Sequence, residues 1–243
     1  MVSLTETNKL LLDSLELVNK DKPDEALKNI QNLFEENNLS EKDYELISAI
    51  LMANGDFDKA ALTFPKANNY AAVVFLSIIK GELNKAKEIL NNTPNSSLAE
   101  WCKFLIDLFS EKLFFKKTPS FLQIRHYLEI TVYYLLIANN KSFVSTLKNK
   151  LNCLIEANID TEKFVGYAYF HFGNCSEAIE YLNKSIQRNS YDGETYFALA
   201  GVYEKEEDYF LAAAMLENAA LLLPEHYPTK VLQEKIAKKL KTN

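Results

Sequence analysis

The sequence predicts an all-α protein, an α-solenoid of stacked helical hairpins with an irregular middle and a C-terminal capping helix. The first observation is a pattern written twice between residues 159 and 224, at a spacing of 34 residues. The second is the low content of glycine and proline, six of each in 243 residues, which fall mostly between segments of helical periodicity. The third is a hydrophobic content of 48%, which is ample for a core and too high for a disordered chain.

The two copies of the pattern match position by position. The second copy has the order aromatic, leucine, small, aromatic, alanine, large, alanine and proline in Tyr196, Leu199, Ala200, Tyr203, Ala212, Leu216, Ala219 and Pro224. The positions 34 residues earlier are Glu162, Val165, Gly166, Tyr169, Ala178, Leu182, Ser185 and Ser190. Every pair except the first keeps a similar size or a helix-ending role. Small residues let two helices approach closely, and the large ones fill the space beside them.

This pattern resembles the tetratricopeptide repeat (TPR) family, whose unit is a helix–turn–helix of this length. The glycine of the turn between the two helices is present as Gly173, while the second copy has Glu207 and Asp208 there. The resemblance implies a right-handed α-solenoid in which hairpins stack, because no single hairpin can bury its apolar face alone.

The resemblance divides the chain into four parts. They are N-terminal TPR-like hairpins over 1–94, divergent helical hairpins over 95–158, two well-matched units over 159–226 and a capping helix over 227–243. In the first part, helices are expected over 5–19 and 24–36, and in the second part over 98–115, 121–138 and 143–157.

Local signals refine these expectations. Ser40, with Asp43 three residues later, predicts a helix start with a variant of the capping box. Pro65 is expected to end a helix early, so the second hairpin is a shortened unit. The capping helix is expected over residues 229–240, with one apolar side formed by Val231, Leu232, Ile236 and Leu240.

Charge argues against a nucleic-acid binder. The net charge of −6 comes from 33 acidic and 27 basic residues mixed along the chain, whereas a nucleic-acid binder usually has a basic stripe. The main basic cluster lies at the end of the sequence, in Lys230, Lys235, Lys238, Lys239 and Lys241. We favour a solvated last helix whose lysines complement its dipole over the alternative, an anion-binding tail.

The cysteines and the N-terminal residues indicate the cellular compartment in which the protein is expected. Cys102, Cys153 and Cys175 are scattered, odd in number and without a CxxC motif, so we expect free thiols and no zinc site. The first residues lack the features of a signal peptide, and the longest apolar runs, such as residues 130–138, are too short to span a bilayer. A cytoplasmic protein without membrane insertion is expected.

No catalytic constellation emerges from the sequence. His126, His171 and His226 lie far apart, and the chain has no HExxH, GxGxxG, GxxxxGK[ST] or GxSxG motif. We therefore expect no enzyme activity, no cofactor and no metal. A catalytic site in the divergent middle, around Trp101 and His126, is the least favoured alternative.

The resemblance implies that the first helix of each hairpin lines a concave groove. The positions that face the groove in the family are mostly apolar here, and they lack the lysines and asparagines of TPR proteins that clamp acidic tails. Either the groove binds an apolar or amphipathic segment of a partner, or the chain covers the groove itself. The residues expected to bind a partner are Tyr167, Phe170, His171, Phe197 and Gly201, with Phe75 and Ile78 from the N-terminal half.

The sequence thus favours a non-catalytic protein–protein interaction scaffold or adaptor, a subunit of a larger complex that binds a protein or peptide partner. The alternative is a self-associating regulatory TPR domain that forms a homodimer.

Overall fold

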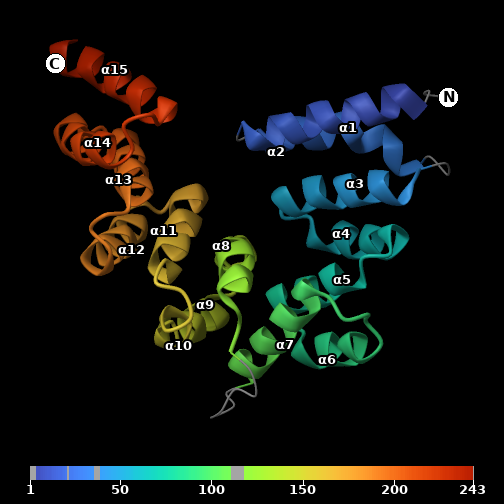
Figure 1. Cartoon of the computed structure of the whole chain (residues 1–243). Coiled ribbons are helices and arrows are strands. Elements are labelled where there is room, and N and C mark those ends of the chain that lie inside the picture. Colours follow the sequence, from blue (N-terminus) through green and yellow to red (C-terminus); the bar gives the residue numbers. More distant parts are fainter. Residues whose placement is uncertain (1–3, 21, 36–38, 111–117, 243) are drawn as a thin grey trace. The chain divides into compact units, whose positions relative to one another are not determined.

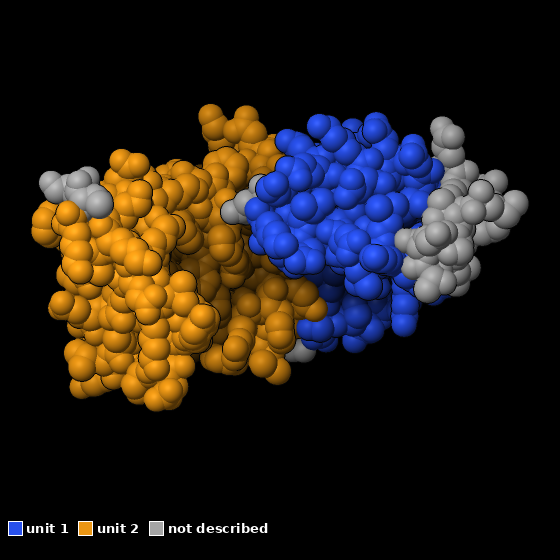
Figure 2. All heavy atoms as spheres, turned by 90° about the horizontal axis from the view of Figure 1, so that it is seen from above, with its two compact units in different colours: residues 1–111 blue, residues 112–243 orange. Residues whose placement is uncertain are grey.

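The computed structural model describes residues 4–20, 22–35, 39–110 and 118–242, and within these ranges it contains helices and no strand (Figure 1). The chain divides into two compact units, residues 1–111 and 112–243, which Figure 2 colours blue and orange. Each unit is a stack of helical hairpins, as the sequence predicts. No helix in the described ranges is both long and apolar enough to cross a bilayer.

Unit 1 contains three hairpins and a seventh helix. Its elements are α1 (Leu4–Asn19), α2 (Pro23–Ile30), η1 (Gln31–Glu35), α3 (Glu41–Ala53), α4 (Phe57–Thr63), η2 (Phe64–Ala67), α5 (Tyr70–Ile79), α6 (Leu83–Asn91) and α7 (Ser97–Phe109). The pairs α1–α2, α3–α4 and α5–α6 pack as hairpins, and α7 packs against α5 and α6. Trp101 of α7 is fully buried in this unit.

Several local expectations can be compared with unit 1. The capping box at Ser40 and Asp43 is confirmed, because the Ser40 hydroxyl accepts from the Asp43 N–H and the Asp43 carboxylate accepts from the Ser40 N–H. The early helix end at Pro65 is confirmed as well, since α4 has only seven residues and continues as a 3-10 turn. The expected helix over 24–36 is in fact α2 followed by η1, and residue 36 lies outside the described residues. Similarly, α7 ends at Phe109 within the expected 98–115, of which residues 111–115 lie outside the description.

Unit 2 contains the two well-matched hairpins. Its helices are α8 (Phe121–Ile137), α9 (Lys141–Asn149), α10 (Asn152–Ile155), α11 (Thr161–Phe172), α12 (Cys175–Arg188), α13 (Gly193–Lys205), α14 (Tyr209–Leu222) and α15 (Tyr227–Thr242). The hairpins α11–α12 and α13–α14 are the repeated pattern, and α11 also packs against α8. The expected helix over 143–157 is divided into α9 and α10.

The last helix, α15, closes the stack. Ile236 is buried against Ala200, Ala212 and Leu216 of the α13–α14 hairpin, with Leu232 and Leu240 packed around this cluster. The capping role is as expected, but Val231 is 46% exposed and does not belong to the packed side.

The six hairpins formed by the described helices close with the same backbone hydrogen bond. In each, the N–H of the residue that precedes the second helix donates to the carbonyl five residues earlier, at 2.8–2.9 Å. The donor–acceptor pairs are Lys22–Leu17, Asp56–Leu51, Glu82–Ser77, Asn140–Leu135, Asn174–Tyr169 and Asp208–Tyr203. In the five turns where the residue just before the donor is described, that residue has positive φ: Gly55, Gly81, Asn139, Gly173 and Glu207. The last three donors are 34 residues apart, so the described chain is a TPR-like helical-repeat protein and the hairpin α8–α9 belongs to the repeat.

Candidate functional site

The structure brings together the expected site residues of α11 and α13. The Phe170 ring lies beside the imidazole of His171, with centroids 6.0 Å apart, and a methyl group at Gly201 would lie 3.4 Å from Cζ of Phe170. The ring of Phe170 therefore crosses from α11 onto the backbone of α13. Phe170 and Gly201 are half-buried and His171 is exposed.

Phe197 extends this surface toward α15. Its ring meets the ring of His226 edge to face, with centroids 4.9 Å apart, and it also packs on the core cluster around Ile236. His226 is oriented by Thr229, because its Nδ1 lies 2.7 Å from the threonine hydroxyl. His226 lies far from the other histidines in the sequence and in no motif, so this edge-to-face contact could not be predicted from its spacing. We call Tyr167, Phe170, His171, Phe197, Gly201 and His226 the aromatic face.

Buried charge lies next to the aromatic face. Lys163 of α11 is only 6% exposed, and its Nζ lies 2.9 Å from the Asp192 carboxylate, 3.3 Å from Glu194 and 3.7 Å from Asp160. Burial lowers the pKa of the Lys163 ammonium, but the hydrogen bond and charge of Asp192 outweigh this effect and leave that pKa raised. Three carboxylates around one ammonium leave this end of the face acidic.

Tyr167 lies within this acidic surrounding. Burial raises the pKa of its phenol, and the carboxylates of Asp192 and Glu194 raise the pKa further, so the hydroxyl stays protonated. His171 connects the face to α8, because its Nδ1 lies 3.0 Å from the Glu129 carboxylate while 58% of its side chain stays exposed.

Phe75 and Ile78 do not belong to the site. Phe75 is 5% exposed and Ile78 is fully buried, because α5 is apolar on nearly every side and packs against η2, α6 and α7. The repeat register places these two residues on the groove side, but in the structure they are core residues of unit 1. They are therefore not carried into the candidate site.

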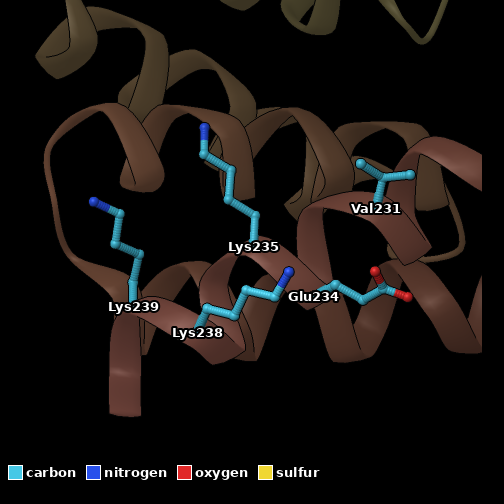
Figure 3. Close-up of a pocket in the computed structure, with 5 residues that line it drawn as sticks. All are labelled: Val231, Glu234, Lys235, Lys238 and Lys239. Atoms are coloured by element: carbon cyan, nitrogen blue, oxygen red, sulfur yellow. The ribbon is translucent and has the colours of Figure 1, made fainter. Parts of the chain in front are cut away.

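The surface of unit 2 is also hollowed at sites outside the aromatic face. One hollow, of about 520 Å³, runs along α15, where Figure 3 shows the side chains of Lys235, Lys238 and Lys239 beside Val231 and Glu234. Lys235 is paired with Glu204 of α13 at 2.8 Å. Another hollow, of about 400 Å³, lies between α8, α9 and the end of α11. Among the described residues, no group of three or more histidine, cysteine, aspartate and glutamate side chains is arranged to hold a metal ion.

Comparison with known proteins gives distant structural similarity only. No protein-family model matches the sequence, and no curated protein matches it. Among solved structures, the APC/C hetero-tetramer Cut9–Hcn1 is 17% identical at a TM-score of 0.36, over 95% of this chain and 46% of that one. The TPR domain of P58(IPK) is 14% identical at a TM-score of 0.39, over 96% of this chain and 64% of that one. A tetratricopeptide repeat protein from Parabacteroides merdae is 14% identical at a TM-score of 0.38, over 95% and 98% of the two chains. The chain thus covers less than two thirds of the length of the first two of these structures.

Proposed function

We propose that this chain is a non-catalytic interaction scaffold, a subunit of a larger assembly, that binds a segment of a partner protein on the aromatic face of unit 2. The observation that carries the proposal is the placement of Phe170 over Gly201. Because Gly201 has no side chain, the ring of Phe170 lies against the backbone of α13, and one aromatic surface continues from α11 to α13. Aromatic side chains supply a disproportionate share of the binding energy in protein interfaces, and these lie next to solvent.

The charges beside the aromatic face indicate the chemistry of the segment. Asp160, Asp192 and Glu194 outnumber Lys163 at one end, and Glu129 lies beside His171. A segment with apolar side chains and a basic residue complements this surface, since an exposed cation is attracted both to carboxylates and to ring faces. An acidic segment would meet repulsion there.

Site-specific photo-crosslinking in the native host tests this proposal. p-Benzoylphenylalanine in place of Phe170 keeps an aromatic ring at the face, and the same replacement of Phe210 places the reagent on α14, where Phe210 is 80% exposed. We expect a discrete crosslinked protein from position 170 that position 210 does not give. Identical products from both positions would contradict the proposal.

A second candidate function, homodimer formation, rests on α14. Phe210 and Leu221, three turns apart on this helix, are 80% and 81% exposed, so this helix offers two large apolar side chains for a second copy to cover. Light scattering on the purified chain separates the two functions. A dimer that Phe210→Lys with Leu221→Lys converts to a monomer supports self-association, whereas a monomeric wild type excludes it.

A further inference from the structure

The hollow between α8, α9 and α11 has the size and composition of a ligand pocket. Its volume of about 400 Å³ lies in the range of small-ligand sites. It is lined by residues of the end of α8, the turn to α9, α9 itself and Phe172, the last residue of α11, which is 44% exposed. It lies wholly within unit 2 and is separate from the aromatic face.

The floor of the pocket is apolar. Leu135 is fully buried there, Leu136 and Val144 are half-buried, and Phe172 covers them from α11. The next unit of the repeat has a glutamate in the place of Phe172, because the residue 34 positions later is Glu206. A ligand in the pocket would therefore bury apolar surface of Leu136, Val144 and Phe172 that is partly exposed to solvent.

The lip of the pocket is positively charged. Lys141 stands in the first turn of α9 and Lys148 in the last, and among the described lining residues none is acidic. Lys148 is already paired, because its Nζ lies 2.7 Å from the Glu177 carboxylate and 5.5 Å from the ring centroids of Tyr169 and Tyr181. Lys141 is exposed and supplies the net positive charge of the pocket. It lies at the N-terminus of α9, where the helix dipole disfavours a cation and favours a bound anion.

We propose that this pocket binds a ligand in which a carboxylate lies a few bonds from an apolar group. The apolar group would pack on Leu136, Val144 and Phe172, and the carboxylate would face Lys141. Two sources offer this chemistry, a free organic acid and an acidic residue beside an apolar one in a peptide segment. The inference does not depend on the aromatic face.

Methyl-labelled protein of residues 1–243 and three probes of similar size test the charge preference. 4-Phenylbutyrate, its neutral amide and 4-phenylbutylamine are titrated while NMR follows the methyl groups of Leu135, Leu136 and Val144. We expect saturable shifts of these methyl groups with the acid, about fivefold to tenfold weaker binding of the amide and still weaker binding of the amine. Equal affinity for all three probes, or shifts that do not saturate, would overturn the proposal.

Charge reversal at the lip assigns the site. Lys141→Glu should weaken binding of the acid by about fivefold to tenfold at low salt and remove its advantage over the amine. Lys230→Glu, an equivalent reversal at an exposed position of α15, should leave all three affinities unchanged. If both variants have the same effect, the preference reflects net charge and the assignment to this pocket is wrong.

The source of the carboxylate is decided with peptides. Acetyl-Gly-Ser-Phe-Glu-Ser-Gly-amide and its glutamine counterpart are added to the same labelled protein. Shifts of the same methyl groups by the glutamate peptide alone identify a peptide segment, and shifts by phenylbutyrate alone identify a free acid. If neither ligand moves these methyl groups, the proposal fails.

Discussion

Gly166 marks the closest approach of α11 and α12, and replacing it with alanine should weaken the hairpin. A Cβ atom at this position would lie 2.7 Å from Cγ of Leu182 and 3.2 Å from the Leu182 backbone nitrogen. Leu182 is fully buried, so its side chain has little room to turn away. Alanine is favoured over glycine in a helix by about 1 kcal/mol, but overpacking costs about 1–3 kcal/mol. Because backbone as well as side chain must move, we expect the free energy of unfolding to fall by about 1–2 kcal/mol.

Gly201 provides the matched control. It lies in the first helix of the next hairpin, and a Cβ atom there would make only an ordinary contact, 3.4 Å from Cζ of Phe170. Gly201→Ala should therefore raise the free energy of unfolding by up to about 1 kcal/mol through helix propensity. The two variants make the same chemical change and should move stability in opposite directions.

Urea titration followed by circular dichroism measures both effects, and hydrogen exchange of the α11 and α12 amides locates the first. The single tryptophan, Trp101, is buried in unit 1, so its fluorescence provides a separate signal from that unit. With an m-value of about 2–3 kcal/mol/M, the urea midpoint of Gly166→Ala should fall by about 0.5 M. If Gly166→Ala is as stable as Gly201→Ala, the close helix approach at Gly166 does not constrain the hairpin and the reasoning is refuted.

Two further predictions concern a carboxylate and two thiols. Burial raises the pKa of Asp192, but hydrogen bonds from Thr195 and Lys163 outweigh it and leave that pKa below its usual value of 3.8. The stability that this carboxylate contributes is therefore present above its unfolded pKa and is lost as the pH falls below about 3.8. Urea titrations between about pH 2.5 and 6 measure how the free energy of unfolding falls toward acid pH. Asp192→Asn should make this fall less steep. A fall as steep as that of the wild type would contradict this. Cys102 is fully buried, and burial raises the pKa of its thiol. Iodoacetamide should therefore modify the half-buried Cys153 in the native protein and Cys102 only after unfolding. Peptide mass spectrometry of the two states measures this difference.

The sequence was sufficient to predict the packing of the two matched hairpins. The repeated positions are similar in side-chain size, and side-chain size decides which residues can lie where two helices pack together. Gly166 faces Leu182 in the first copy, and in the second Ala200 and Leu216 share one buried cluster. Such positions tolerate few alternatives, so the pattern survives in the sequence.

The hairpin α8–α9 was not predicted as a copy of the repeat, because its core residues depart from the pattern. Val132 stands where the first matched unit has Gly166, and Lys148 stands where it has Leu182. The turn keeps its chemistry, however. Asn139 has a φ of 53° and Asn140 caps α9 through its side chain, as Gly173 and Asn174 do 34 residues later. The polar pair at the turn was the signal that could have identified this unit.

The site was predictable only in part, because periodicity tells which side of a helix a residue occupies and not what covers that side. Phe170 and Ile78 take the same place in the first helix of a hairpin, yet Phe170 is half-buried and Ile78 is in the core. The difference depends on the neighbouring helices. Unit 1 adds α7 against α5, and α7 comes from a stretch whose pattern gave no guide to its packing.

The one mismatch between the two copies has a physical explanation. Glu162, in place of the aromatic Tyr196, is 6% exposed and paired with Arg188 at the end of α12. The residue 34 positions after Arg188 is Leu222, so the copy with tyrosine has leucine where the copy with glutamate has arginine. The arginine offsets the cost of burying the Glu162 carboxylate, a cost that the tyrosine of the second copy does not have. A position that departs from a repeat is therefore best interpreted together with the residue that it contacts. A single sequence does not show which residue that is.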